Sequence, residues 1–192
     1  MNRRSPVASR RQGGRRTIVA VGSLGALALL LGGCGIGAHA LETAAPSVAA
    51  SAVLSATLAQ ARTQVASAIS AAGFQVQDAQ VPYRPPESPS VAAAPRTVIQ
   101  AILPAAPDGG FVVLYAFADP AAAAAAAQEL AAYIGTGPGR VQFPTDARFV
   151  IRQIGAAVAF DTWSPAGSAD PDSEERLATV VGSVGTAYDV PR

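Results

Sequence analysis

The sequence predicts an α+β domain built on an antiparallel sheet of about five strands, with helices packed mainly on one face of the sheet. Two observations carry this class. Helical and strand-like segments follow one another in the order α-β-β-β-α-β-β-α along residues 51–190. Hairpin connections dominate between the strand segments, and a hairpin joins antiparallel neighbours.

The first helix is expected from about Ser51 to Ala72, because apolar residues recur there at steps of three and four and therefore share one stripe. This stripe consists of Leu54, Leu58, Ala61, Val65, Ile69 and Ala72. Gly73 supplies the left-handed residue that commonly ends a helix, and Phe74 can pack back on the last turn.

A strand from Phe74 to Val81 and a long proline-rich loop are expected next. Five prolines between residues 82 and 95 exclude a regular β-ladder. Tyr83 and Arg84 at the start of this loop are candidate recognition residues, since long loops are often functional and proline-rich segments can be ligands of a partner. A stiff surface loop is the structural alternative.

Two further strands are expected at Thr97 to Leu103 and at Phe111 to Phe117, joined by an irregular hairpin loop that contains Gly109 and Gly110. The second of these segments is apolar on both of its faces. It therefore predicts a central strand that is covered on both sides, or one with a side that faces a partner.

The two later helices have recognisable beginnings. Asp119 is a capping residue and Pro120 takes the first helical position of an alanine-rich helix that ends at Gly135. The last helix is expected to be capped by Asp172, with Glu175 three residues further on as in a capping box. The inner stripe of this helix comprises Leu177, Val180, Val181 and Val184.

The clearest hairpin runs from Phe149 to Trp163. A two-residue turn at Gly155-Ala156 places residues opposite each other when their numbers sum to 311. The face expected to be core carries Phe149, Ile151, Val158 and Phe160. The other face carries Arg148, Val150, Arg152, Ala159, Asp161 and Trp163.

The second face of this hairpin is a candidate binding surface. Arg148 lies opposite Trp163 and Arg152 lies diagonal to Asp161 in this register. An arginine, a tryptophan and a carboxylate on an open sheet face can bind a carboxylated or sugar-like ligand, or a protein partner. The structural alternative is a solvated face with one cation–π contact and one weak surface ion pair.

The sequence predicts no enzyme, no cofactor and no metal site. The one histidine, His39, lies in a segment of small residues, where Glu42 alone cannot complete a metal site. Without a nearby histidine, no serine or threonine has an evident base. Four carboxylates occur together at the start of the last helix, where acidic residues have a structural role: Asp170, Asp172, Glu174 and Glu175.

The N-terminal segment has the organisation of an export signal. A basic region extends to Thr17, an apolar run follows from Ile18 to Leu31, and the run ends in Leu31-Gly32-Gly33-Cys34. This ending resembles the bacterial lipobox, Leu-small-small-Cys. The resemblance implies cleavage between Gly33 and Cys34 by signal peptidase II and lipid attachment to Cys34, the one cysteine of the chain.

Two alternatives concern this segment. An uncleaved transmembrane anchor would use the 19 residues from Ile18 to Ile36, although five glycines weaken that helix. Ser9-Arg10-Arg11-Gln12 is similar to the start of a twin-arginine export signal, but two glycines follow it. The expected organisation is a signal peptide at 1–33, a flexible tether at 34–50 and the α+β domain at 51–190.

Charge and architecture limit the function. Removal of residues 1–33 takes away six of the 14 arginines and leaves a formal charge of −5 with the 13 acidic residues. An acidic body has no electrostatic reason to bind nucleic acid. The architecture resembles the small envelope lipoproteins of unknown function found in bacteria, and this resemblance implies export and anchoring to the outer face of a membrane.

The expected role is a non-enzymatic interaction module. Its partners would be the membrane, through the lipid on Cys34, and another envelope protein. One alternative is a small-ligand-binding lipoprotein that serves a transporter, and a further one is a hydrolase. An enclosed cleft would favour the small ligand, whereas carboxylates that converge in a pocket would favour the hydrolase.

Overall fold

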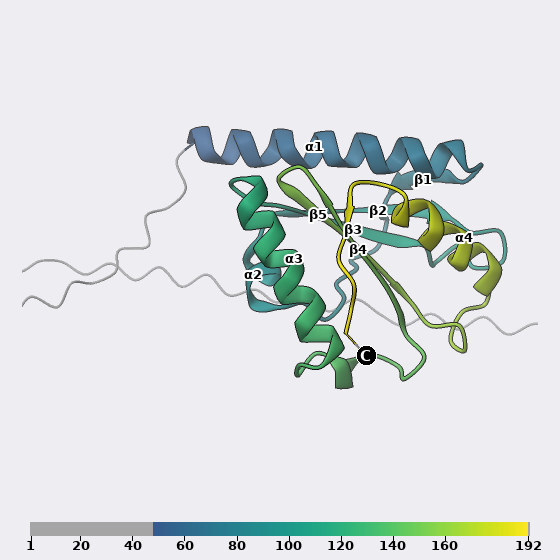
Figure 1. Ribbon diagram of the computed structural model, residues 1–192. Coiled ribbons are helices and arrows are strands. Elements are labelled where there is room, and N and C mark those ends of the chain that lie inside the picture. Colours follow the sequence, from purple (N-terminus) through teal and green to yellow (C-terminus); the bar gives the residue numbers. More distant parts are fainter. Residues whose placement is uncertain (1–47, 192) are drawn as a thin grey trace, which may run out of the picture. The chain divides into compact units, whose positions relative to one another are not determined.

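The computed structural model describes residues 48–191. The expected signal peptide, the lipid-bearing Cys34 and almost all of the tether, including His39, lie outside the described residues. Within them, six antiparallel strands form one open sheet (Figure 1). The strands are β1 (Gln75–Asp78), β2 (Arg96–Ile102), β3 (Phe111–Ala116), β4 (Arg148–Ile154), β5 (Ala157–Trp163) and β6 (Thr186–Ala187).

The strand order is β1-β2-β3-β5-β4-β6, so β3 and β5 are central and β4 is bordered on its outer side by the two residues of β6. The predicted α+β class with a single antiparallel sheet is confirmed. Of the two possibilities for β3, the structure has the central strand covered on both sides, because Val112, Val113, Leu114 and Tyr115 are all buried.

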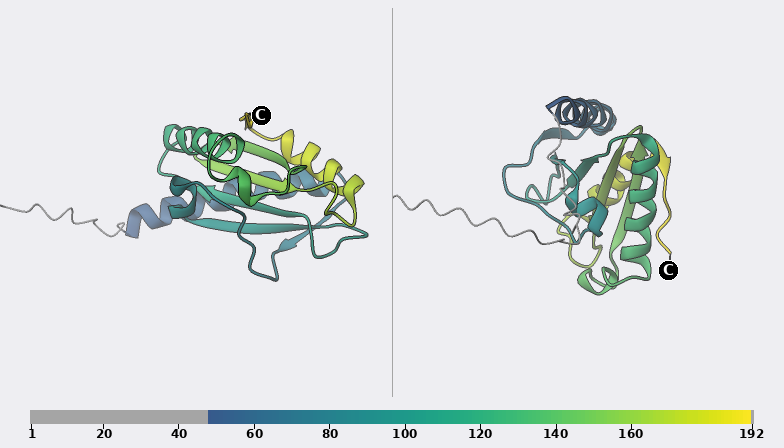
Figure 2. Two further views of the ribbon diagram at one scale, coloured as in Figure 1. Left: turned by 90° about the horizontal axis from the view of Figure 1, so that it is seen from below. Right: turned by 90° about the vertical axis from the view of Figure 1, so that its left-hand side faces the viewer.

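In the part of the chain that the structure describes, four α-helices and one 3-10 turn pack around the sheet. They are α1 (Val48–Ala71), α2 (Pro89–Ala93), α3 (Pro120–Gly135), the 3-10 turn η1 (Arg140–Gln142) and α4 (Pro171–Gly182). Helices α1 and α4 cover one face of the sheet, and α3 with the short α2 covers the other (Figure 2). The helices are therefore divided between the two faces, rather than packed mainly on one face as the sequence predicts, and they enclose two separate apolar cores.

Each core is built from the alternating sides of the same strands. Val65 and Ile69 of α1 and Leu177 of α4 pack on the face that carries Val112 and Leu114. On the opposite face, the alanine-rich side of α3 packs against side chains of β3, β4 and β5. Small alanine side chains allow α3 to lie close to these strands, which explains how a chain with few aromatic residues fills this core.

The expected hairpin pairing is confirmed. Strands β4 and β5 pair from Arg148↔Trp163 to Ile154↔Ala157, and Gly155 in the turn has a φ of 59°. This left-handed backbone is the conformation that a two-residue hairpin turn requires and that glycine adopts without strain. The faces of the hairpin therefore separate as the sequence predicts, with Ile151, Val158 and Phe160 in the core beneath α3.

The helix ends agree with the sequence except at α4. Gly73 has a φ of 90° after α1, and the Asp119 carboxylate accepts a hydrogen bond from the Ala122 amide at the start of α3. The expected cap of α4, Asp172, is wrong. Asp170 caps this helix instead, because Pro171 takes the first helical position and the Asp170 carboxylate accepts the Ser173 amide at 3.2 Å.

Besides the 3-10 turn η1, two short elements were not expected. Helix α2 forms inside the proline-rich loop, and it tolerates Pro89 because this residue lies in the first turn of the helix. The side chain of Val91 in this helix is buried in the core. Strand β6 has only two residues and neither has a strong β-pattern. Its position depends on tertiary contacts with β4, which local sequence does not encode.

Candidate functional site

A groove of about 1150 Å³ runs along the outer edge of β4. It is lined from both faces of the sheet, by Ala178 and Thr179 of α4 on one side and by Ile134 at the end of α3 on the other. Arg148, Phe149 and Val150 form its floor. The groove therefore surrounds the first half of an edge strand and is only half open to solvent.

The groove exists because the C-terminal segment separates from β4. Strand β6 pairs only with Arg152 and Gln153, and one more backbone bond follows, from the Tyr188 amide to the Ile151 carbonyl at 3.1 Å. The chain then crosses to the end of α3 (Figure 1). A Cβ on Gly135 would lie 2.7 Å from the Pro191 carbonyl oxygen, so this crossing requires a glycine at the end of α3.

The separation leaves the first half of β4 with a free edge. The Ile151 carbonyl points outward, because it accepts the Tyr188 amide rather than a group of β5. Main-chain groups alternate in direction along an antiparallel strand, so the amide and carbonyl of Phe149 also point outward. Among residues 48–191, no strand pairs with Phe149 on this side.

Two of the predicted surface residues meet in this groove. Arg148 and Trp163 are opposite each other in the β4–β5 register, and both line the groove on the α4 side. Arg148 is exposed, and in the described part of the chain its guanidinium makes no hydrogen bond or ion pair. Trp163 is 9% exposed, and its Nε1–H is buried without a hydrogen-bond partner in the described structure.

The second arginine of the groove, Arg140, is occupied by the protein itself. Its guanidinium donates to the Thr145 carbonyl at 2.7 Å and to the Pro144 carbonyl at 3.2 Å, and it lies 5.8 Å from the centre of the Phe149 ring. These contacts hold the loop before β4 in place. Arg140 therefore shapes the groove, and sequence reasoning had no signal for it, since its partners are backbone carbonyls.

The groove also contains carboxylates. Asp146 accepts the Ala166 amide at 2.7 Å and the Ser164 hydroxyl at 2.8 Å, and these bonds, together with the charge of Arg148, lower its pKa. Glu175 and Asp189 are exposed and lie in the groove lining. The groove lining therefore contains both positive and negative side chains. Of its carboxylates, that of Asp146 is fixed by hydrogen bonds within the domain.

The other two residues of the predicted hairpin surface are not part of an open face. Asp161 is 1% exposed, because α4 and α1 cover the face that the sequence left open. Burial and then the nearby Glu174 raise the pKa of Asp161 to about 8, while the Thr162 amide has a smaller opposite effect. Neither carboxyl oxygen has a hydrogen-bond partner of normal geometry in the described structure.

Arg152 does not pair with Asp161. Its Nε donates to the Val184 carbonyl at 2.7 Å and its Nη2 to the Gly185 carbonyl at 2.8 Å. These bonds hold the segment between α4 and β6 against β4. The expectation of one open surface that contains all four residues is therefore wrong, and the physical reason is the coverage of this face by helices.

The loop residues Tyr83 and Arg84 are engaged within the domain. Tyr83 stacks on Phe111 with ring centres 4.5 Å apart, and burial raises its pKa. Arg84 donates to the Glu87 carboxylate at 2.8 Å and to the Ala92 carbonyl at 3.2 Å. These two residues anchor the proline-rich loop and lie apart from the groove lining.

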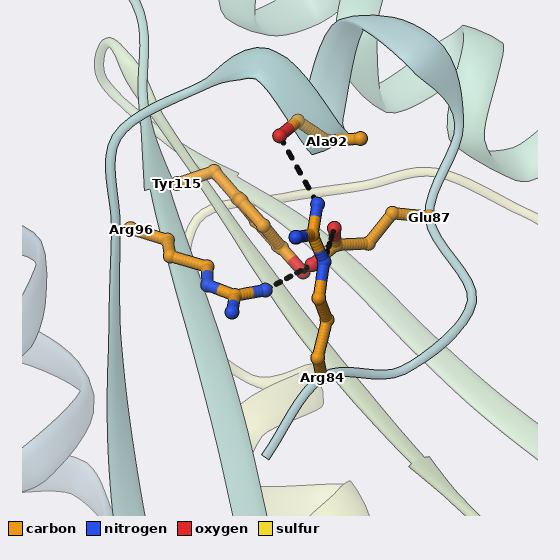
Figure 3. Close-up of polar contacts among 5 residues, drawn as sticks. All are labelled: Arg84, Glu87, Ala92, Arg96 and Tyr115. Carbon is orange, nitrogen blue, oxygen red and sulfur yellow. Dashed lines mark hydrogen bonds and ion pairs between the residues drawn. The ribbon is translucent and has the colours of Figure 1, made fainter. Parts of the chain in front are cut away.

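Glu87 is the centre of this anchor. Its side chain is 2% exposed and accepts from Arg84, from Arg96 at 2.8 Å and from the Tyr115 hydroxyl at 2.7 Å, as Figure 3 shows. Burial and this bond to Glu87 raise the pKa of Tyr115. Glu87 therefore fixes the loop to β2 through Arg96 and to β3 through Tyr115.

A pair of buried carboxyls was also missed by sequence reasoning. Glu174 lies on the sheet side of α4 and its pKa is raised, mainly by burial, with the Gly110 amide acting in the opposite direction. Asp161 and Glu174 are close enough to interact electrostatically. Neither residue of this pair lines the groove.

Comparison of the chain with protein-family models, with curated proteins and with solved structures gave no match. Within residues 48–191, no helix combines the length and hydrophobicity that are needed to cross a bilayer. The same residues contain no group of three or more histidine, cysteine, aspartate or glutamate side chains arranged to hold a metal ion.

Proposed function

We propose that this chain is a lipid-anchored, non-enzymatic protein of the bacterial cell envelope, and that its folded domain binds another envelope protein through the groove beside β4. The observation that carries the proposal is the edge of β4 that residues 48–191 leave free, in a groove that also contains the guanidinium of Arg148, which makes no hydrogen bond or ion pair within the same residues. A free strand edge and an unpaired charge are both features that a protein partner can satisfy.

The sequence before the domain supports the location. Leu31-Gly32-Gly33-Cys34 follows a basic segment and an apolar run, as in bacterial lipoproteins. A lipid on Cys34 would hold the domain at the outer face of a membrane, close to other envelope proteins. Attachment to the membrane raises the effective concentration of such partners, so a groove of moderate affinity is sufficient.

The form of the groove favours a protein over a small ligand. Small-ligand sites usually enclose most of the ligand in a cavity between elements or lobes. This groove is partly open to solvent and follows a strand edge, so it encloses a small molecule less completely than such a cavity does. A small-ligand-binding lipoprotein that serves a transporter is therefore the second candidate function. A bound ligand enclosed by the domain would favour it.

Site-directed crosslinking in native membranes tests this function. A photoreactive amino acid at Thr179, which is exposed in the groove, should crosslink a specific envelope protein. The same amino acid at Gln60, which is exposed on α1, is the matched control. The crosslink should disappear when Arg148 and Trp163 are both changed to Ala, and should weaken with Arg148→Ala alone.

The single Arg148→Ala variant keeps the test valid if the double variant does not fold, because Arg148 is exposed and makes no described hydrogen bond. Identical crosslinking patterns from Thr179 and Gln60 would contradict the proposed role of the groove. Retention of every crosslinked neighbour in a folded double variant would contradict it as well.

A further inference from the structure

We propose that the groove takes an extended peptide segment of the partner, which adds to the free edge of β4 as a strand and places one carboxylate against Arg148. This inference rests on the proposed function, because it names the chemistry of the partner that occupies the same groove. It specifies a β-strand with a single acidic side chain as the recognised element.

The main-chain part of the inference comes from the protein's own C-terminal segment. Strand β6 and the Tyr188 amide already pair with the outer edge of β4 as far as Ile151. The outward amide and carbonyl of Phe149 continue that ladder, and a peptide can supply the next hydrogen bonds. The edge is therefore one that accepts a strand in this fold, and residues 48–191 leave the part of it at Phe149 unpaired.

The two sides of the groove define the side chains of such a strand. Residues of an added strand alternate between the α4 side and the α3 side. On the α3 side they meet Ile134, Phe149 and Val190, which favour an apolar side chain. On the α4 side they meet Arg148 beside the indole of Trp163, which favours a carboxylate on an apolar stem.

The surrounding charges limit the number of acidic residues. Arg148 interacts electrostatically with Asp146, whose oxygens are already held by Ser164 and Ala166. An incoming carboxylate can therefore provide the hydrogen bonds that Arg148 lacks in the described structure. Glu175 and Asp189 in the lining would repel further negative charge, so one acidic residue is favoured over an acidic run.

The experiment uses the full-length protein in detergent and blocked peptides of known sequence. The first probe is acetyl-Thr-Val-Glu-Val-Thr-amide, whose glutamate and valines alternate as the groove requires. The chain contains one tryptophan, so its fluorescence reports on Trp163 alone. Binding should change this fluorescence and should slow hydrogen exchange at the Phe149 and Ile151 amides.

Three matched changes separate the contributions. Glutamine in place of the peptide's glutamate should weaken binding about tenfold, as expected for loss of a hydrogen bond between charged groups. Arg148→Gln should weaken binding of the first peptide about equally and should abolish the preference for glutamate over glutamine. Arg62→Gln, which removes an exposed guanidinium on α1, should leave the affinity unchanged.

The main-chain claim has its own control. A peptide that carries N-methyl groups on the residues facing β4 keeps every side chain but cannot complete the ladder, and it should not bind. Equal binding of the methylated and unmethylated peptides would overturn strand addition. Protection of Phe149 in the absence of peptide, together with concentration-dependent dimerisation, would overturn it in favour of a second copy of the chain.

The results also separate this inference from the proposed function. A specific crosslink from Thr179 without binding of the peptides at millimolar concentration would retain the partner-binding groove and overturn the strand. Peptide binding with the expected glutamate preference, but no specific crosslink in membranes, would retain strand recognition and contradict the envelope-partner role.

Discussion

At the scale of single residues, Asp161 is the least expected feature of the domain. It lies between Val112 and Val150 in the centre of the sheet, beneath α4, and its carboxyl oxygens have no hydrogen-bond partner in the described structure. An ionised carboxylate in such a place is costly, so a protonated side chain is favoured at neutral pH. The raised pKa of Asp161, about 8, expresses the same preference.

Asp161→Asn should therefore stabilise the protein at alkaline pH and change its pH dependence. Folding favours the protonated acid, and this contribution is complete below the unfolded pKa of about 4 and is lost as the pH rises to about 8. The neutral amide does not undergo this loss. The gain above pH 8 should be about 1–3 kcal/mol, measured by urea unfolding, and should be small near pH 4.

The matched control for this experiment is Asp172→Asn, because Asp172 is an exposed acid in the first turn of α4. Its unfolding free energy should follow the wild-type curve within about 0.5 kcal/mol at every pH. Parallel pH curves for Asp161→Asn and the wild type would show that Asp161 does not titrate differently in the folded state.

Glu87 is the opposite case, a buried carboxylate whose partners are all present. Glu87→Ala should lower the free energy of unfolding by about 2–3 kcal/mol, because it leaves the buried Tyr115 hydroxyl without its acceptor and separates Arg84 and Arg96 from their shared partner. The loss should be smaller than for a fully buried ion pair, because both guanidinium groups reach solvent. Urea unfolding monitored by circular dichroism measures the change.

The control for Glu87 is Glu175→Ala, which removes an exposed glutamate from α4 and should change the unfolding free energy by less than about 0.5 kcal/mol. In the double variant of Glu87→Ala with Tyr115→Phe, the loss of unfolding free energy should be smaller than the sum of the losses in the two single variants. Both substitutions remove the same hydrogen bond. Fully additive losses would contradict the bond between these two side chains.

At the scale of elements, the local sequence predicts which strands pair and where most helices end, but it does not predict which helix covers which face of the sheet. The β4–β5 register follows from a glycine turn and from alternation within 15 residues, so Arg148 and Trp163 could be placed together from sequence. The burial of Asp161 could not be predicted from sequence. It depends on α4, a separate segment of the chain, which covers the face of the sheet that carries Asp161. The alternation pattern alone does not distinguish a solvated polar face from one that a helix covers.

The groove depends on the same kind of long-range information. Its floor at Arg148 and Phe149 follows from the hairpin, whereas the free edge depends on where the C-terminal segment leaves β4 after Tyr188. Arg152 could be placed on β4 from sequence, but its partners are carbonyls of a segment about 30 residues away. Backbone acceptors have no sequence signature, so such contacts emerge only from the fold.

The start of α4 gives a prediction at this scale. Asp170→Ala should lower the thermal midpoint by several degrees, because the Asp170 carboxylate accepts the amide of Ser173 in the helix and the amide of Ala105 in the β2–β3 loop. Asp172→Ala, two residues later, should have little effect on the midpoint. Thermal unfolding monitored by circular dichroism compares the two, and an equal loss in both variants would contradict Asp170 as the cap.

At the scale of the whole molecule, the sequence has a basic N-terminal segment followed by an acidic remainder. Six arginines lie before residue 17, and the first acidic residue of the chain is Glu42. Positive charge near an apolar segment favours retention of the charged side in the cytoplasm. Under the proposed function, the location of the protein depends on Cys34.

Cys34→Ala should abolish both cleavage and lipid attachment. Signal peptidase II acts before a lipid-modified cysteine in the family that this segment resembles, so the variant should remain at the size of the precursor and incorporate no radiolabelled palmitate in cells. Ser47→Ala, a change just before α1, is the matched control and should be processed and labelled normally. Normal processing of Cys34→Ala would contradict the lipoprotein assignment, and membrane fractionation of the same cells would then distinguish an uncleaved anchor from a released protein.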